Sequence, residues 1–333
     1  MHGRARPRQG AAEAAETLGA ERVAHLVVGE DGAGQRLDNY LLKLAKGVPK
    51  SHVYRIVRSG EVRVNGGRAA VDQRLALGDR LRVPPLRIAA GAPPAPIPRG
   101  EMPPILYEDE HVMAVDKPAG LAAHGGSGVS FGLIERVRAA RPNQPFLELA
   151  HRLDRETSGI LLLAKSRRAL VGLHEQLREG RVDKRYLALV KGDWVDDRRH
   201  VKAALSKFLT REGERRVAVD EDGMPSHTIF NLRQRFGAFT LLEAELKTGR
   251  THQIRVHLAH LGFPIVGDDK YGDFDLNRRA ARGEFGARLP RMFLHAHETR
   301  FAHPVGGAPV ELTAPLPRDC DDFLRGLVRA TTF

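Results

Sequence analysis

The sequence predicts an α+β protein of two domains, in which a small N-terminal domain precedes a larger, mixed and mainly antiparallel one. The chain has 333 residues, more than a single hydrophobic core usually organises. A Pro- and Ala-rich stretch, residues 86–102, is typical of a semi-rigid extended linker and separates the two parts. In the second part strand-like segments dominate and helical periods interrupt them irregularly, which favours α+β over a regular βαβ repeat.

The first 30 residues differ in composition from the rest of the chain. They are rich in Ala, Gly, Arg and Glu and have no apolar period, so we expect a disordered leader over residues 1–30, with at most a short helix over residues 11–20. The basic start lacks the apolar run of a secretory signal, and no later apolar segment has the length of a membrane span. We expect a cytoplasmic protein with no membrane partner.

Residues 34–85 have the pattern of a compact domain that opens with two helices. The first has apolar residues at i, i+3, i+4 and i+7, namely Leu37, Tyr40, Leu41 and Leu44. Gly47 and Pro49 should end it. Ser51 is the expected N-cap of the second helix and Gly60 its stop. The second helix has an apolar face of Val53, Ile56 and Val57.

Short strands are expected next. Arg63 stands between two valines, and the Asn65-Gly66 pair directly after them is a strong hairpin signal. Residues 75–77 and 81–83, on either side of a Gly78-Asp79 turn, predict further strands.

The charge of the chain points to a polyanionic partner. The formal net charge is +12, which favours RNA or DNA ahead of an anionic membrane; a merely soluble basic enzyme is the alternative. Residues 34–85 hold eleven Lys and Arg against four Asp and Glu, more than half of the excess. Lys50, Tyr54 and Arg58 recur at i, i+4 and i+8 beside Arg55, so this face suits phosphate contacts unless it is only a solvated surface.

Residues 103–333 are expected to form the large domain. Strands are predicted over residues 105–107, 112–115, 160–164, 186–190, 228–233 and 239–246. Helices are predicted over residues 131–139, 168–177 and 252–261.

One segment of this domain, HRLDRETSG at residues 151–159, has the features of a reactive loop. Five of its nine residues are charged or titratable, and the apolar run at 160–164 must be a buried strand. A polar loop that leads into a buried strand can hold a reactive group rigidly. From the spacing alone, a stabilising Asp–Arg pair is an equal alternative.

This segment resembles the central motif of the RluA family of pseudouridine synthases, and three further stretches agree with that family in order and spacing. These are ILYEDEH at 105–111 with DKPAG at 116–120 and HGG at 124–126, DKRYLALV at 183–190, and GRTHQIRVH at 249–257. The resemblance covers nearly everything from residue 34 onward. Within the family the chain looks most like the RluC type, whose members modify large-subunit (23S) ribosomal RNA, and residues 34–85 resemble the S4 RNA-binding domain.

The resemblance implies the roles of four residues. Asp154 matches the catalytic carboxylate. Tyr186 matches the tyrosine whose ring stacks on the target base, and its hydroxyl could also help remove the proton from carbon 5, a role that needs a perturbed pKa. Arg255 matches the arginine that keeps the carboxylate ionised, as a nearby opposite charge would. Arg152 matches the arginine that fills the space left by a flipped uridine. The alternatives for Tyr186 and Arg255 are an ordinary strand aromatic and a helix-surface arginine.

For the small domain we expect RNA contacts from a set of basic and aromatic residues: Lys46, Lys50, Tyr54, Arg55, Arg58 and Arg63. The implied protein is an isomerase that acts as a monomer. Two other functions stay open: a non-catalytic RNA-binding or ribosome-assembly factor, and an Asp-dependent hydrolase that releases free uracil.

No cofactor is expected. Moving a base from a nitrogen to a carbon linkage exchanges neither electrons nor phosphate, and no phosphate loop or dinucleotide fingerprint is present. The single cysteine, Cys320, is interpreted as structural. The histidines at 252, 257, 260, 295 and 297 could suggest a metal, but spacings of five and three do not place the first three on one helical face.

Overall fold

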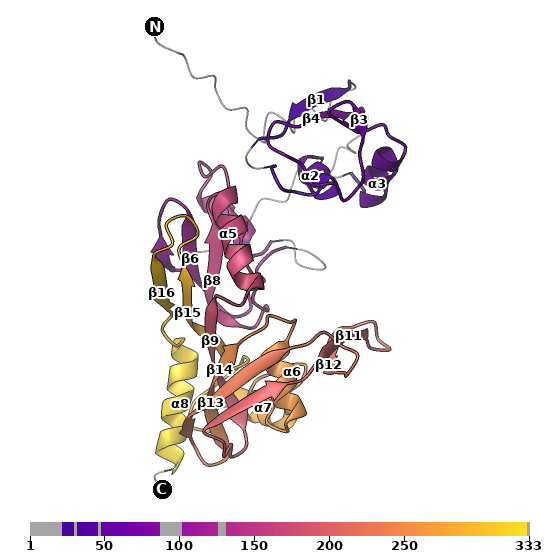
Figure 1. Cartoon of the computed structure of the whole chain (residues 1–333). Helices are drawn as coiled ribbons and strands as arrows, with labels where there is room; N and C mark the ends of the chain where they lie inside the picture. The colour runs from indigo at the N-terminus through magenta and orange to yellow at the C-terminus, as the bar shows by residue number, and fades with distance from the viewer. Residues whose placement is uncertain (1–21, 30–31, 46–47, 87–101, 126–130, 332–333) are drawn as a thin grey trace. The chain divides into compact units, whose positions relative to one another are not determined.

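The computed structural model describes residues 22–29, 32–45, 48–86, 102–125 and 131–331. The chain divides into two compact units, Met1–Ile97 and Pro98–Phe333 (Figure 1). The helix expected over residues 11–20, Lys46, Gly47 and nearly all of the predicted linker lie outside the described residues.

The first unit packs two helices, α2 (Leu37–Leu44) and α3 (Lys50–Arg58), with a four-stranded antiparallel sheet. The strand order is β1-β4-β2-β3, with bounds Ala24–Val27, Arg80–Val83, Arg63–Val64 and Gly67–Arg68. Asn65 and Gly66 both have positive φ, 51° and 80°, as a type I′ turn requires. The two helices and the Asn65-Gly66 hairpin are confirmed.

Three expectations for this unit are wrong. Residues 24–27 belong to the predicted leader, but they form β1, because pairing with β4 buries Ala24 and Leu26. Ser51 does not cap α3: the N-cap is Pro49, and no side chain caps this helix. Residues 75–77 form no strand, because Leu75 is buried from a loop while Leu77 is 64% exposed.

The second unit is built on a ten-stranded sheet, in which eight strands follow the order β10-β13-β14-β9-β15-β8-β6-β5. Two short strands extend it: β16 (Pro309–Thr313) pairs with β15 and β7 (Glu148–Leu149) with β8. The eight are Arg198–Lys202, His227–Arg235, Phe239–Leu246, Asp183–Lys191, Leu294–Ala302, Ser158–Ala164, Val112–Lys117 and Ile105–Glu108 in that order. The pairs are antiparallel except β15 with β8, so the mainly antiparallel sheet is confirmed.

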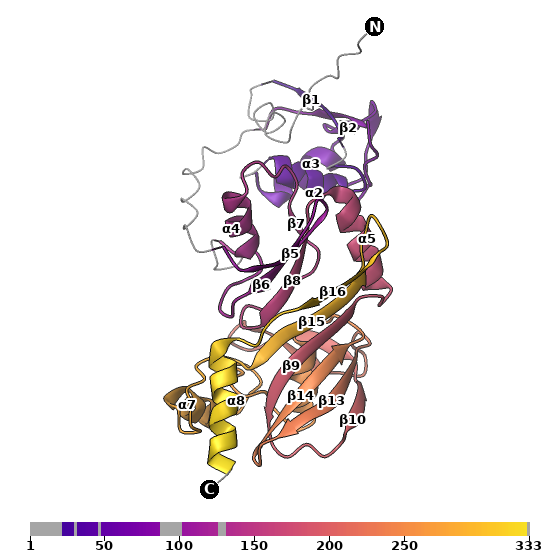
Figure 2. The same cartoon turned by 90° about the vertical axis from the view of Figure 1, so that its left-hand side faces the viewer.

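Helices cover both faces of this sheet. Strand β8 shows why its sequence is continuously apolar: Ile160 and Leu162 pack in a cluster with α5 (Arg167–Arg178), while Leu161 and Leu163 pack in another with α4 (Leu133–Ala140). Near β9, α6 (Gln253–His260) shares the α4 face. The opposite face carries α7 (Phe274–Arg282) and α8 (Arg318–Thr331) (Figure 2).

A separate hairpin, β11 (Leu205–Leu209) with β12 (Arg215–Val219), packs on α6 through Val217 and Val256. The six predicted strands and three predicted helices of this unit are confirmed. The elements that were not predicted are β7, β10, β11, β12, β15, β16, α7 and α8. Cys320 is fully buried, and burial raises the pKa of its thiol to about 12, as fits a structural residue.

Candidate active site

A pocket of about 660 Å³ in the second unit brings together all four residues expected to act in catalysis. Arg152 and Asp154 come from the loop at 151–157 before β8, Tyr186 from β9 and Arg255 from α6. Segments about 100 residues apart therefore line one cavity.

The loop that carries Asp154 is fixed on both sides. Backbone of Arg155 accepts hydrogen bonds from the buried Lys117 ammonium (3.0 Å) and from the Gly120 amide (2.9 Å). At the far end, Gly159 has φ of 106°, and a Cβ there would lie 2.2 Å from the Ala296 carbonyl oxygen. Only glycine fits where β8 approaches β15 this closely, so this glycine sets where the loop ends.

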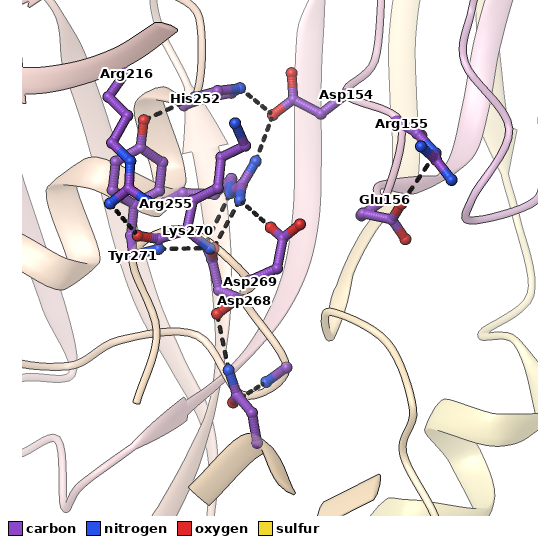
Figure 3. A network of polar contacts seen from close by, with 12 residues as sticks. Asp154, Arg155, Glu156, Arg216, His252, Arg255, Asp268, Asp269, Lys270 and Tyr271 are labelled. Carbon is purple, nitrogen blue, oxygen red and sulfur yellow. Dashed lines mark hydrogen bonds and ion pairs between the residues drawn. The ribbon is translucent and has the colours of Figure 1, made fainter. Parts of the chain in front are cut away.

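Arg255 faces Asp154, but its strongest partners are two other carboxylates (Figure 3). Nη1 lies 3.6 Å from Asp154 Oδ2, whereas Nε and Nη2 donate to the two oxygens of Asp268 at 2.7 and 2.6 Å. Nη2 also donates to Asp269 at 3.0 Å. Burial opposes the charge, yet the hydrogen bond to Asp268 and the nearby carboxylates raise the pKa of Arg255 above its usual range. The guanidinium is therefore a fixed cation, and the alternative of a helix-surface arginine is wrong.

Tyr186 is 6% exposed. Burial, together with the charge of Asp154, raises the pKa of its phenol above the usual range. The hydroxyl therefore stays protonated near neutral pH and is a poor proton acceptor before substrate arrives.

The pocket carries more positive charge than the protein itself neutralises. Its cations are Arg152, Arg178, Lys184, Lys247, Arg250 and Arg255, and its one carboxylate is Asp154. Across the described residues, no carboxylate lies within ion-pair distance of Arg152, Arg178 or Lys184. Lys184 is the least exposed of these three, and burial lowers the pKa of its ammonium. An anionic ligand would relieve this imbalance.

Four further site residues were not predicted from the sequence in this role: His252, Asp268, Asp269 and Tyr271. His252 was considered only as a metal ligand, yet its Nε2 lies 3.8 Å from Asp154 Oδ2. The other three lie in the polar run at 268–271 between Gly267 and Gly272. Like the 151–159 segment, this run marks a polar loop that can hold reactive groups, but the sequence alone assigns no role to any of its residues. In the described part of the chain, no group of three His, Cys, Asp or Glu is placed to hold a metal ion.

In the first unit, four of the expected RNA-binding residues share one surface depression on α3. Lys50, Tyr54, Arg55 and Arg58 line it. Lys50 Nζ and Arg58 Cζ lie 5.2 and 5.6 Å from the centre of the Tyr54 ring, whose hydroxyl donates to Asp38 at 2.8 Å.

Two expected RNA-binding residues do not belong to this depression. Arg63 lies on β2, where it pairs in register with Arg68 and Arg82. Lys46 lies outside the described residues.

The two-domain organisation agrees with the families that the chain matches. Residues 111–260 match the RNA pseudouridylate synthase family, and residues 35–81 match the S4 domain. The chain therefore belongs to the RNA pseudouridylate synthase family and is an isomerase. Within the part that the structure describes, no helix is both long and apolar enough to cross a membrane.

Individual relatives cover nearly the whole chain. Ribosomal large subunit pseudouridine synthase C of Escherichia coli K12 is 48% identical over 305 residues, 90% of this chain and 95% of the relative. The protein of the same name from Pasteurella multocida is 49% identical over 92% of this chain and 94% of its own length. Among solved structures, human RNA pseudouridylate synthase domain containing 1 aligns with a TM-score of 0.53 and 25% identity over 70% of this chain and 98% of that one.

Proposed function

We propose that this enzyme converts specific uridines of large-subunit (23S) ribosomal RNA into pseudouridine, with Asp154 as the catalytic carboxylate and no cofactor. The relatives that span the chain are named for the large ribosomal subunit. In the reaction the C1′–N1 bond breaks, a C1′–C5 bond forms, the C5 proton leaves and N1 gains one. The reaction is neither an oxidation nor a reduction, so it needs no electron acceptor.

The observation that carries the proposal is the position of Asp154 in the pocket. Its side chain is 22% exposed and lies beside a buried arginine whose charge is fixed by Asp268. A carboxylate beside a fixed cation but still open to the pocket can add to the ribose or the pyrimidine, or take a sugar proton.

The neighbours of Asp154 suit a flipped nucleotide. We propose that the Tyr186 ring stacks on the base, a role that needs no ionised hydroxyl. Arg152 is exposed at the pocket, and its planar guanidinium would replace part of the stacking lost when the uridine leaves the helix. The cations without carboxylate partners, Arg178 and Lys184 among them, would bind RNA phosphates.

We propose that residues 34–85, together with β1, form an RNA-binding domain that residues 86–102 join to a catalytic domain over 103–333. Its RNA contacts would come from Lys46 and Arg63 and from the depression on α3. The enzyme would act as a cytoplasmic monomer on free rRNA or on an assembling particle.

Replacing Asp154 tests this function. With Asp154→Asn or Asp154→Ala as the only copy of the gene, mapping of 23S rRNA should show uridine at every position that depends on this protein. The variants should still bind RNA, because Asp154 contributes no positive charge. Asp222→Asn, which removes an exposed carboxylate of the same unit, should leave the modification intact.

Two results would support the other functions. Pseudouridine that persists in the Asp154→Ala cells excludes the carboxylate mechanism, and tight binding of a short uridine RNA without any product favours a non-catalytic binding factor. Free uracil among the reaction products, separated by chromatography, would indicate a hydrolase.

A further inference from the structure

The two oxygens of Asp154 are not equivalent. Arg255 Nη1 and His252 Nε2 both approach Oδ2, at 3.6 and 3.8 Å. No described residue forms a hydrogen bond to Oδ1, and Oδ2 is the oxygen nearer to both side chains. Oδ2 is therefore approached from two sides, at distances just beyond a hydrogen bond, while the other oxygen points away from both side chains (Figure 3).

His252 approaches Asp154 from an unusual backbone conformation. It is the N-cap of α6, with φ of 54° and ψ of 19°, in the left-handed region. Among the described non-glycine residues only Asn65, in the hairpin turn, shares a positive φ. This region costs a residue such as histidine about 1 kcal/mol or more, and such strain is concentrated at functional sites.

The other side of the imidazole is held by Tyr271. The Tyr271 oxygen lies 2.8 Å from His252 Nδ1 (Figure 3). It also accepts a hydrogen bond from the backbone amide of Val217, on β12, at 3.0 Å. Burial raises the pKa of the Tyr271 phenol, so the hydroxyl keeps its proton. Because the phenol oxygen already accepts from Val217, its own O–H is free to donate to Nδ1.

An imidazole that accepts at Nδ1 carries its proton on Nε2. The Nε2–H then faces Asp154 Oδ2 at 3.8 Å, a contact that shortens to a hydrogen bond if the site tightens around substrate, as catalytic contacts commonly do. Burial lowers the pKa of His252, although the charge of Asp154 opposes this, so the neutral ring is the favoured form. A neutral donor can orient a carboxylate without cancelling the charge that the reaction needs.

We propose that His252 is a positioning residue that holds Asp154 Oδ2 through its Nε2–H, with Tyr271 fixing the tautomer, so that Oδ1 is the oxygen that reacts. This rests on the proposed role of Asp154. Arg255 alone cannot set the orientation, since its Nε and Nη2 are directed at Asp268. The β11–β12 hairpin contributes to this arrangement through Val217. The Val217 amide occupies the Tyr271 oxygen as acceptor, so that the Tyr271 hydroxyl donates to His252.

The tautomer can be measured in the free, full-length enzyme without any assay of activity. Nitrogen-15 spectra of the histidine rings, with His252 assigned by its disappearance in His252→Gln, should show a neutral ring protonated at Nε2 near pH 7.5. In Tyr271→Phe the ring should become a mixture of tautomers. A ring protonated at Nδ1, or an imidazolium, in the wild-type enzyme overturns the proposal whatever the fate of the Asp154 variants.

Two amide substitutions separate the contact from the backbone strain. Asn tolerates the left-handed conformation but is shorter, so His252→Asn should lower kcat about 100-fold, as for the loss of one preorganised donor. The longer amide of His252→Gln should restore kcat to within about 10-fold of wild type. KM should not change in either variant.

His260→Gln, an exposed histidine of the same helix, is the matched control and should behave as wild type. Thermal unfolding checks that each variant is folded. If His252→Asn is folded and retains the wild-type kcat, or if KM rises instead, His252 does not position Asp154. If His252→Asn is unfolded, the tautomer of the wild-type ring decides alone.

Discussion

At the scale of single residues, Arg255 shows how the resemblance and the geometry differ. The sequence predicts that it lies against Asp154, and it does so at 3.6 Å. Its two short hydrogen bonds go to Asp268 instead. A bidentate pair with Asp154 would hold both oxygens of the reactive carboxylate. Pairing with Asp268 fixes the guanidinium while leaving Asp154 able to react.

Lys117 supports the loop that carries Asp154, and this support can be tested by a stability measurement. Its fully buried ammonium donates to the carbonyls of Pro118, Leu121 and Arg155 at 2.9, 2.8 and 3.0 Å. Lys117→Met leaves three acceptors unsatisfied and should lower the free energy of unfolding by about 3 kcal/mol in urea titrations. Lys207→Met, on an exposed site of β11, should change it by less than about 0.5 kcal/mol. Equal effects of the two substitutions would show that Lys117 does not anchor the loop.

The difference in stability between the wild type and Lys117→Met should depend on pH in a definite direction. Burial lowers the pKa of Lys117 from 10.5 to about 7. Between these values the unfolded chain holds a proton that the folded chain has released, so the contribution of this group to stability rises with pH. The stability of the wild type relative to Lys117→Met should therefore increase from pH 7 toward pH 10. A constant difference between the two proteins would contradict this.

The sequence predicted which residues lie together in the pocket where those residues stand in contiguous motifs. Asp154, Tyr186 and Arg255 could each be matched because the residues around them carry the pattern. Asp268 and Tyr271 could not, because their roles depend on contacts with α6 and β12 that only the fold creates. A role of the Tyr186 hydroxyl as a base would need a lowered pKa, and burial instead moves its pKa further from neutrality.

At the scale of elements, strands with one apolar face were predictable and strands with charged faces were not. Strand β14 was predicted to its exact ends because apolar residues dominate it. Strand β15 reads LHAHETRFA and gives no such signal. Its polar residues are stabilised by partners on neighbouring strands: His297 Nε2, for example, lies 3.2 Å from Glu243 Oε2. The periodicity of apolar residues in the sequence cannot predict such cross-strand pairs.

Glu243 is the centre of that charged face and predicts how the sheet responds to acid. Its carboxylate, 1% exposed, binds Arg233, Arg185 (3.1 Å) and His297. Burial opposes its charge, but these partners lower the pKa of Glu243 from 4.5 to about 2. The stabilisation is therefore complete above pH 4.5 and is lost as the pH falls toward 2.

Glu243→Gln should be less stable than wild type at pH 7, and the difference should shrink as the pH falls from 4.5 to 2. Urea unfolding at a series of pH values measures it. Glu311→Gln, which removes a 60% exposed carboxylate paired with Arg300 on the same sheet, should change little. A difference between Glu243→Gln and wild type that persists at pH 2 would show that the ion cluster is not its source.

At the scale of the whole molecule, each unit has its own hydrophobic core. The core of the first unit consists of residues between Ala24 and Leu86, and the pocket with Asp154 is lined by residues of the second unit alone. Binding of RNA by the first unit and chemistry in the second should therefore be separable by substitution.

The double substitution Lys50→Ala with Arg58→Ala tests that separation. It removes two cations beside Tyr54 on α3, so affinity for rRNA should fall and the salt dependence of binding should flatten by about one ion per lost phosphate contact. The kcat at saturating RNA should stay at the wild-type value, because no residue of the pocket changes. Filter binding at several salt concentrations, with single-turnover kinetics, measures both.

A matched control removes the same charge elsewhere. Arg282→Ala with Arg318→Ala takes two exposed cations from α7 and α8. If it lowers affinity and flattens the salt slope as much as the α3 pair does, net charge explains binding and α3 has no special role. If the α3 pair instead lowers kcat at saturating RNA, the first unit takes part in the catalytic step and the two functions are not separable. We expect only the double substitution on α3 to lower the affinity, and we expect kcat to stay unchanged. The reason is that each unit has its own core and that residues of the second unit alone line the pocket.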